Sequence, residues 1–199
     1  MSTFETIFHS SEPDRDKFLS RIFGIFNEDM VRCWCSDPRS PFEDIGRPTI
    51  TPHQAPRGYT LDFTLRSRET GKIYVGEMKC ELEYQNYRYL TLESSSQLEH
   101  HAKEAFRLFL DAATSPNRHR VTTRGQPQTI NGAVLVWGRC TEAGRSSVIK
   151  EYGLHAILSL EEIIGDLITW RNECFAELLN QRANWCNELF NGLRRIAAL

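Results

Sequence analysis

The 199-residue chain has no apolar run near the roughly 18 residues that a membrane span needs. Its N-terminus also has no basic segment followed by an apolar one, so we expect a cytoplasmic protein without membrane contact. A net charge of −2 lacks the basic excess of a protein that coats nucleic acid, although a local basic groove is compatible with it. Internal repeats, glycine-rich phosphate loops and serine-hydrolase elbows are absent, which argues against those classes.

Cysteine is present but sparsely patterned. The six cysteines form no Cys-x-x-Cys pair, and the closest two are Cys33 and Cys35. A structural zinc site would favour tighter pairing of ligands, so we expect reduced and mostly buried thiols. A hydrophobic content of 40% with 25% charged residues is typical of a globular protein, and the length predicts one domain over residues 1–199.

Two strand-like runs, 61–65 and 73–79, flank a polar turn that contains one glycine. If the turn is centred between Glu69 and Thr70, Asp62 lies directly opposite Glu77. Side chains alternate along a strand, so Glu77 and Lys79 share one face. A bulge at Gly71 would shift this pairing.

Two carboxylates held this close repel each other, and a divalent cation removes the repulsion. Mg²⁺ takes oxygen ligands, usually one or two carboxylates with waters and substrate phosphate. Such a metal polarises a phosphoryl oxygen and lowers the pKa of bound water, while Lys79 can neutralise developing charge. This is the outline of a phosphodiester hydrolysis site. The alternative is a surface Glu-x-Lys pair beside an unrelated aspartate.

Asp62 followed across a hairpin by Glu77-Met78-Lys79 resembles the signature of the PD-(D/E)xK nuclease superfamily, which has the restriction-endonuclease-like fold. The order of elements is compatible over about residues 14–168. The resemblance implies that Asp62 and Glu77 bind Mg²⁺, for which Mn²⁺ can substitute. The Met78 carbonyl would be a third ligand and Lys79 the catalytic lysine. Leu61 stands where the motif name has proline, a residue that the chemistry does not require.

Two further residues enter through this resemblance. Glu28 lies on a predicted helix over 14–35, where the superfamily often has a glutamate that reaches the metal; the alternative is an i,i+4 pair with Arg32. Gln97 lies in the first turn of a helix predicted over 96–113 from a capping-box pattern. Some related nucleases have a glutamine there that orients substrate or water, but polar residues are also common at helix starts.

Candidate nucleic-acid contacts lie in two segments. Arg118, Arg120 and Arg124 belong to the most basic stretch, predicted as a loop over 117–124, where they could neutralise phosphates or be solvated. Tyr84 and Arg88 follow the hairpin, and they could stack on bases and touch phosphates or pack as rim residues.

The remaining pattern completes an α/β fold, with a mixed central β-sheet flanked by helices and a helical C-terminal extension. A short strand is possible at 48–50, a continuous apolar run predicts a buried strand at 132–137, and a further strand is predicted at 154–158. Ser159 caps a helix that opens a helical region over 159–197. Its large apolar residues, Trp170, Trp185 and Leu189, are expected to pack on the domain core, or on a second copy in a possible homodimer.

The sequence therefore favours a Mg²⁺-dependent nuclease that hydrolyses phosphodiester bonds of nucleic acid, with DNA preferred over RNA as the partner. The alternative is a catalytically inactive nuclease-like fold that serves as a nucleic-acid- or protein-binding module.

Overall fold

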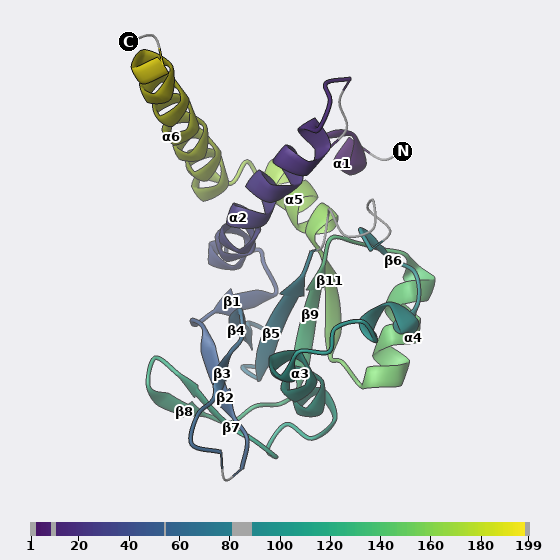
Figure 1. The fold of residues 1–199 in the computed structure, drawn as a ribbon. Coiled ribbons are helices and arrows are strands. Elements are labelled where there is room, and N and C mark those ends of the chain that lie inside the picture. The colour runs from purple at the N-terminus through teal and green to yellow at the C-terminus, as the bar shows by residue number, and fades with distance from the viewer. Residues whose placement is uncertain (1–2, 9–10, 54, 81–88, 198–199) are drawn as a thin grey trace.

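The fold is α/β and is built around a five-stranded mixed sheet (Figure 1). The computed structural model describes residues 3–8, 11–53, 55–80 and 89–197. The sheet has the order β1-β4-β5-β9-β11, with bounds β1 (Phe42–Asp44), β4 (Phe63–Ser67), β5 (Ile73–Lys79), β9 (Ala133–Trp137) and β11 (Ala156–Ser159). Strands β1, β4 and β5 are antiparallel neighbours, whereas β5, β9 and β11 run parallel.

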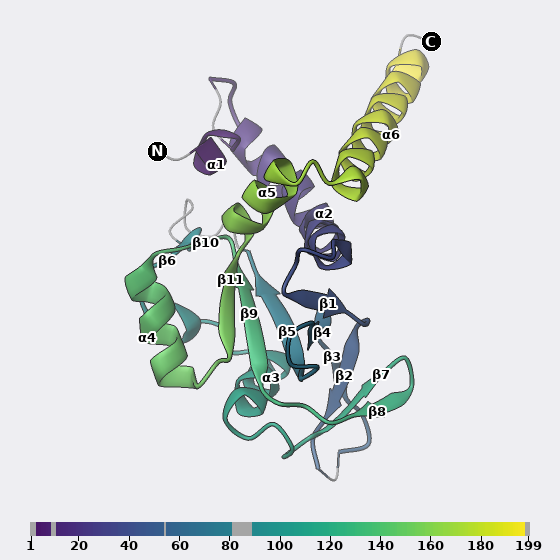
Figure 2. The ribbon, with the colours of Figure 1, turned by 180° about the vertical axis from the view of Figure 1, so that it is seen from behind.

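Helices cover both faces of this sheet because its strands are apolar on both sides. Within β9, Val134 and Val136 join one core cluster, whereas Leu135 and Trp137 join the other. Helices α2 (Arg15–Ser36) and α5 (Leu160–Thr169) pack in the first cluster; α3 (Glu104–Thr114) and α4 (Glu142–Tyr152) pack in the second (Figures 1 and 2). The continuous apolar run at 132–137 is therefore a central strand with helices on both sides, as predicted.

A second sheet extends the domain beside the hairpin. It has the order β3-β2-β7-β8, with bounds β2 (Pro48–Thr51), β3 (Tyr59–Thr60), β7 (Arg120–Thr123) and β8 (Gln126–Gln128). The stretch 117–124, predicted as a basic loop, is thus partly a strand, because β7 pairs with both β2 and β8. A two-stranded parallel pair, β6 (Thr91–Leu92) with β10 (Arg139–Cys140), completes the strands of the described ranges.

Several helix and strand predictions are confirmed. The helix expected at 14–35 is α2, and the strand expected at 48–50 is β2. Ser159 caps α5, since its hydroxyl accepts the backbone N–H of Glu162 at 3.4 Å. The strands expected at 61–65 and 154–158 each begin two residues later than predicted. None of the helices in the described ranges has the length and apolar character that crossing a membrane requires.

The continuous helix predicted over 96–113 is wrong. The capping box is real but belongs to Ser94 and Gln97, and it closes only one 3-10 turn, Ser95–Leu98. The chain then leaves helical geometry, and α3 begins at Glu104. The break lets the His101 ring pack against Phe106 and Trp137, with centroids 5.0 and 5.9 Å away. Helix α4 was not predicted from the sequence.

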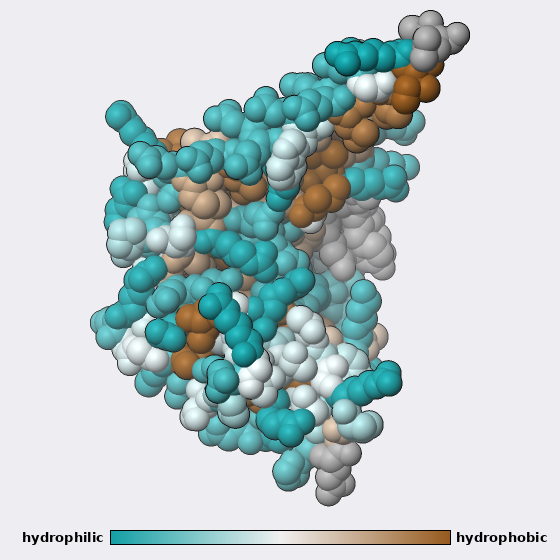
Figure 3. All heavy atoms as spheres, turned by 90° about the vertical axis from the view of Figure 1, so that its left-hand side faces the viewer, coloured by the Kyte–Doolittle hydropathy of each residue, from teal (hydrophilic) through white to brown (hydrophobic). Residues whose placement is uncertain are grey.

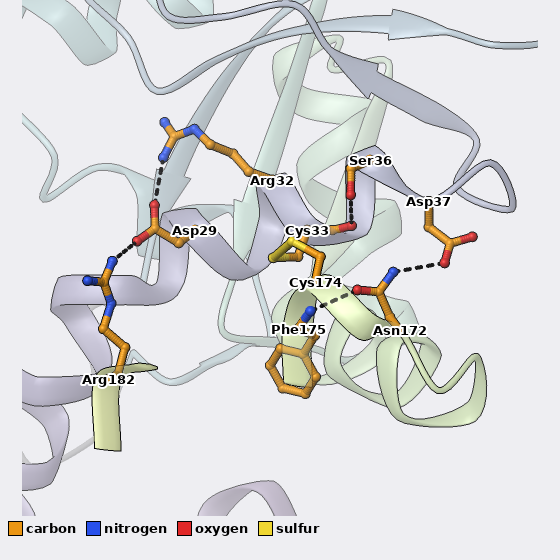
Figure 4. Close-up of a disulfide and its surroundings, with 9 residues drawn as sticks. All are labelled: Asp29, Arg32, Cys33, Ser36, Asp37, Asn172, Cys174, Phe175 and Arg182. Carbon is orange, nitrogen blue, oxygen red and sulfur yellow. Dashed lines mark hydrogen bonds and ion pairs between the residues drawn. A yellow bond between two sulfur atoms is a disulfide. The ribbon is translucent and has the colours of Figure 1, made fainter. Parts of the chain in front are cut away.

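The long helix α6 (Glu173–Ala197) projects away from the sheet and is anchored to α2 at its start (Figures 1 and 4). A disulfide joins Cys33 of α2 to Cys174, with 5.6 Å between the Cα atoms. Asn172 donates to Asp37 at 2.8 Å, and Arg182 pairs with Asp29 at 2.6 Å. The expectation of reduced thiols is therefore wrong for these two cysteines. Disulfides are typical of oxidising compartments, so the cytoplasmic location stays a prediction.

The three large apolar residues of the C-terminal region have different environments. Trp170 is half-buried and stacks on Trp34, with ring centroids 6.4 Å apart, so it packs on the core as predicted. Trp185 and Leu189 are 54% and 59% exposed, and core packing is the wrong prediction for both. Figure 3 shows apolar side chains along one side of α6.

Candidate active site

The β4–β5 hairpin has the register that the sequence predicts. Phe63 faces Gly76 and Arg66 faces Ile73, so the next pair outward is Asp62 and Glu77. The backbone N–H of Asp62 donates to the Gly76 carbonyl at 3.2 Å, which continues the pairing one residue beyond β4. The Asp62 carboxylate in turn accepts the backbone N–H of Met78 at 2.8 Å. Asp62 is thereby fixed at the end of the hairpin, beside the Glu-x-Lys segment.

Glu77 is a buried carboxyl group with a lysine as its direct partner. Only 7% of Glu77 is exposed, and its carboxylate is bonded to the Lys79 ammonium. Burial raises the pKa of Glu77, as do the charges of Asp62 and Glu28, while Lys79 opposes the shift. The Lys79 ammonium also lies 5.2 Å from the centre of the Phe106 ring. Glu77 and Lys79 are therefore held together in a packed environment, where burying a charged side chain costs free energy.

Glu28 reaches this end of the hairpin from helix α2. Its carboxylate pairs with Arg32 at 3.1 Å and with Arg47 at 3.2 Å. The same Arg47 guanidinium lies 3.4 Å from the Asp62 carboxylate, so it bridges the two acids. The i,i+4 pair with Arg32, the alternative interpretation of Glu28, is thus present together with an approach to the hairpin acids.

These side chains open onto one hollow of about 320 Å³. Its lining includes all the acids and the lysine that the sequence singled out at the hairpin and on the first helix: Glu28, Asp62, Glu77 and Lys79. Asn27, Met78 and Cys80 also line it. Residues from α2, from the end of β5 and from Asp62 just before β4 are therefore brought to a common surface, although up to 56 positions separate them in the chain.

The oxygen donors of the hollow suit a hard cation that keeps part of its water shell. Among the described residues, no three His, Cys, Asp or Glu side chains form a group that could hold a metal ion. Mg²⁺ does not require such a cage, since it commonly binds one or two carboxylates with waters and phosphate oxygens. Asp62, Glu77 and the Met78 carbonyl, which accepts from Lys79 at 3.4 Å, fit that pattern.

Gln97 is not among the residues that line this hollow. Its side-chain oxygen accepts the backbone N–H groups of Glu93 and Ser94 at 2.6 and 3.0 Å, and its amide donates to the Thr91 carbonyl at 2.9 Å. All three bonds are local to the capping box. The structure therefore gives Gln97 a role in shaping the turn and does not bring it to Asp62 and Glu77.

The three expected nucleic-acid contacts that the structure describes, Arg118, Arg120 and Arg124, differ in their surroundings. Arg118 pairs with Asp111 at 3.5 Å, Arg120 lies in β7 opposite Thr51, and Arg124 occupies the β7–β8 turn. Arg120 and Arg124 line different hollows. Tyr84 and Arg88 lie outside the described residues.

Sequence reasoning missed two residues that contribute to the site. Arg47 precedes β2 in the proline-rich stretch before the hairpin, 15 positions from Asp62 and 19 from Glu28. Its charge alone distinguishes it, and no periodic pattern links it to the hairpin. Asn27 lines the hollow beside Glu28 and is only 6% exposed, and the one signal in the sequence was an asparagine next to a helix acid.

Comparison of the chain with protein-family models, with curated proteins and with solved structures finds no match. The geometry of the hairpin end and the resemblance of its motif are therefore the features that bear on function.

Proposed function

We propose that this chain is a metal-dependent nuclease of the PD-(D/E)xK type, with a restriction-endonuclease-like fold, that hydrolyses phosphodiester bonds of DNA. The observation that carries the proposal is the meeting of Asp62, Glu77 and Lys79 in one hollow, with Glu77 buried and its pKa raised. Glu77 has Lys79 as its partner, but an acid with a shifted pKa that lines a hollow is a candidate for a functional site. The order α2, β4–β5 hairpin, α3, β9 and β11 also supports the assignment.

The acids, the lysine and Met78 of the hollow have assigned roles in this proposal. Asp62, Glu77 and the Met78 carbonyl would hold Mg²⁺ or Mn²⁺, which would polarise a phosphoryl oxygen and make a bound water more acidic. Lys79 presents its ammonium to the charge that develops on phosphate, or to the attacking water. Glu28 extends the negative surface from α2, and the Met78 amide orients Asp62 through the 2.8 Å bond.

A second function is favoured by Arg47. Its guanidinium already compensates Glu28 and Asp62, which lowers the need for a bound cation at those two acids. A nuclease-like fold with such compensation could serve as a binding module for nucleic acid or protein without catalysis.

A cleavage assay with a matched control separates the two functions. Supercoiled plasmid, linear duplex DNA and single-stranded RNA are each incubated with the protein in Mg²⁺, Mn²⁺ or EDTA. We expect DNA cleavage with either metal, none in EDTA, and none by Lys79→Ala. Lys72→Ala removes the same charge from the exposed far end of the hairpin and should cut like wild type. If the wild-type protein binds no divalent ion at millimolar concentration and cuts none of the substrates, the nuclease proposal fails and the binding module replaces it.

A further inference from the structure

A second, larger hollow, with a volume of about 690 Å³, is lined in part by Arg47, which also contacts the hairpin acid Asp62. It is formed by the end of α2, by β1 and the turn that follows it, and by the β4–β5 and β7–β8 turns. Four arginines and two acids supply its charged lining: Arg32, Arg47, Arg68, Arg124, Glu43 and Asp44. We call this hollow the arginine groove.

Both acids of the arginine groove are already compensated. Asp44 is 3.5 Å from the Arg32 guanidinium, and its carboxylate accepts the backbone N–H groups of Gly46 and Thr64 at 3.0 and 3.3 Å. Glu43 is 3.7 Å from Arg66 on the neighbouring strand. The acids therefore neutralise neither Arg68 nor Arg124, and the groove keeps a positive surplus.

Arg68 and Arg124 have no acidic partner among the described residues, and both are exposed. The Arg68 guanidinium donates to the Cys35 carbonyl at 2.8 Å, so it is held at the last turn of α2, and a guanidinium has further N–H donors to offer a ligand. Arg124 has a φ of 51°, and its side chain lies over Gly46, where an added Cβ would be 3.2 Å from Nε. Backbone geometry thus directs two unneutralised guanidinium groups to one groove.

The arginine groove adjoins the candidate active site through shared side chains. Arg47 lines the groove and lies 3.4 Å from the Asp62 carboxylate, while Arg32 donates to the Asp62 carbonyl at 3.4 Å. A ligand with several regularly spaced negative charges could therefore contact the groove and the hairpin acids together. Guanidinium groups suit phosphate oxygens through paired donors.

We infer that the arginine groove binds nucleic-acid phosphates that lie beside the scissile phosphate. Arg68 and Arg124 are its principal contacts. The inference rests on the proposed function for the position of the scissile phosphate. It assigns to Arg68, Arg47 and Arg32 a contact that the sequence did not suggest, and it separates Arg124 from Arg118 and Arg120. Cys35 at the groove is no nucleophile, because burial raises its pKa to about 12.

Salt-dependent binding tests this inference without catalysis. A fluorescent duplex oligonucleotide is titrated with wild type and with Arg68→Ala/Arg124→Ala in EDTA at several salt concentrations. Loss of two phosphate contacts should lower the slope of log K against log salt by roughly 1.8 and weaken binding for all sequences alike. The control is Arg107→Ala/Lys150→Ala, which removes the same charge from exposed positions on α3 and α4 that line neither hollow. Its slope should match wild type.

The outcomes distinguish the groove from the nuclease. If wild type cuts DNA and the double variant keeps the wild-type slope, the groove assignment fails while the proposed function stands. If the slope falls as expected but wild type never cuts, the groove stands and the nuclease fails. Wild type that binds no oligonucleotide overturns the groove. Inorganic pyrophosphate that displaces the duplex at equal phosphate concentration also overturns it, because the site would then be one for small anions.

Discussion

The hairpin end buries charged side chains, whereas helix α6 exposes apolar ones. Both regions depart from the usual arrangement, in which charged residues face water and apolar residues are buried. At the hairpin, Glu77 and Lys79 are charged groups enclosed by packed residues, and Glu77 is only 7% exposed. Along α6, large apolar side chains lie open, and Ile196 is 69% exposed. Burying charge and exposing apolar surface both cost free energy relative to the ordinary arrangement. Each region is therefore informative about function in a way that a well-packed strand such as β9 is not.

The two departures point to different kinds of ligand. Buried charge that is partly compensated favours a small, charged and directional ligand, such as a cation with its phosphate. An apolar helix face favours a broad surface that excludes water, such as another helix. The hairpin is held by backbone pairing on β5, whereas α6 is tied to the domain through Cys174 and Arg182 in its first half, with a ring contact between Phe190 and Phe18 further along. Changes at one region should leave the other intact.

The largest expected effect is on catalysis at the hairpin. Asp62→Asn removes a ligand charge, so Mn²⁺ binding should weaken markedly and DNA cleavage should fall at least ~100-fold, or about 2.7 kcal/mol in transition-state stabilisation. The amide oxygen can still accept from Met78, so the fold should persist. Calorimetric titration with Mn²⁺ and a cleavage assay measure both effects.

Lys79→Ala sharpens this prediction because an ammonium is not a metal ligand. It should retain most of the Mn²⁺ affinity while losing cleavage. Equal loss of metal affinity in both variants would contradict the assigned division between ligands and lysine. Leu189→Glu on α6 should keep wild-type cleavage, and a loss there would show that the two regions are not independent.

The next effect concerns the tie between α6 and the domain. Cys33→Ala/Cys174→Ala should lower the free energy of unfolding by about 2–4 kcal/mol, since the disulfide constrains a long loop of the unfolded chain. Urea denaturation measures the change, and plasmid cleavage should not respond. Dithiothreitol should destabilise wild type but not the double variant. A reductant effect of equal size on both proteins would show that the pairing of Cys33 with Cys174 does not stabilise the fold.

The hairpin could be predicted because its information is local. Glu69 and Thr70 centre a polar turn between apolar strands, and strand alternation then sets the partner of Asp62 and the face of Lys79. Ser159 likewise predicts the start of α5, because its hydroxyl accepts a hydrogen bond from the backbone of Glu162 only three residues later. In these places the sequence signal and the interaction that it predicts involve the same few residues.

The rest depends on contacts that no short pattern encodes. Arg47 meets Glu28 and Asp62 only after β1 and β2 have folded beside the hairpin. The Ser94–Gln97 capping box is satisfied within a single turn, so it cannot report whether a helix continues. Helical spacing predicts the apolar face of α6 but not what covers it, and this is why core packing of Trp185 was expected in error.

A smaller effect should appear at low pH where α6 joins the domain. Arg39 holds the pKa of Asp37 well below its ordinary value of 3.8, and Asn172 adds a hydrogen bond. A carboxyl with a lowered folded-state pKa stabilises the fold above its unfolded pKa and loses that contribution as pH falls through the range below 3.8. Asp37→Asn should therefore lower the melting temperature at pH 7, with a difference from wild type that shrinks toward pH 2. A difference that stays constant with pH would contradict the ionic origin.

The smallest effect on stability is expected from a substitution on the exposed face of α6. Here the quantity to measure is the mass of the protein in solution. We predict that a second copy of the chain covers this face, because a contiguous apolar stripe is rarely left in water. Light scattering at micromolar concentration should then give twice the chain mass of 23.0 kDa for wild type and the mass of one chain for Leu189→Glu. The melting temperature in dilute solution should change little, since Leu189 is 59% exposed within one chain.

The matched control for this last variant is Asn184→Glu. It adds the same charge to an exposed position on the other side of α6, so it should keep the wild-type mass if the apolar stripe is the contact. Monomeric wild type would remove the homodimer and leave the stripe to a different partner. If both variants have the mass of one chain, charge repulsion separates the copies, and not the loss of the apolar contact at Leu189.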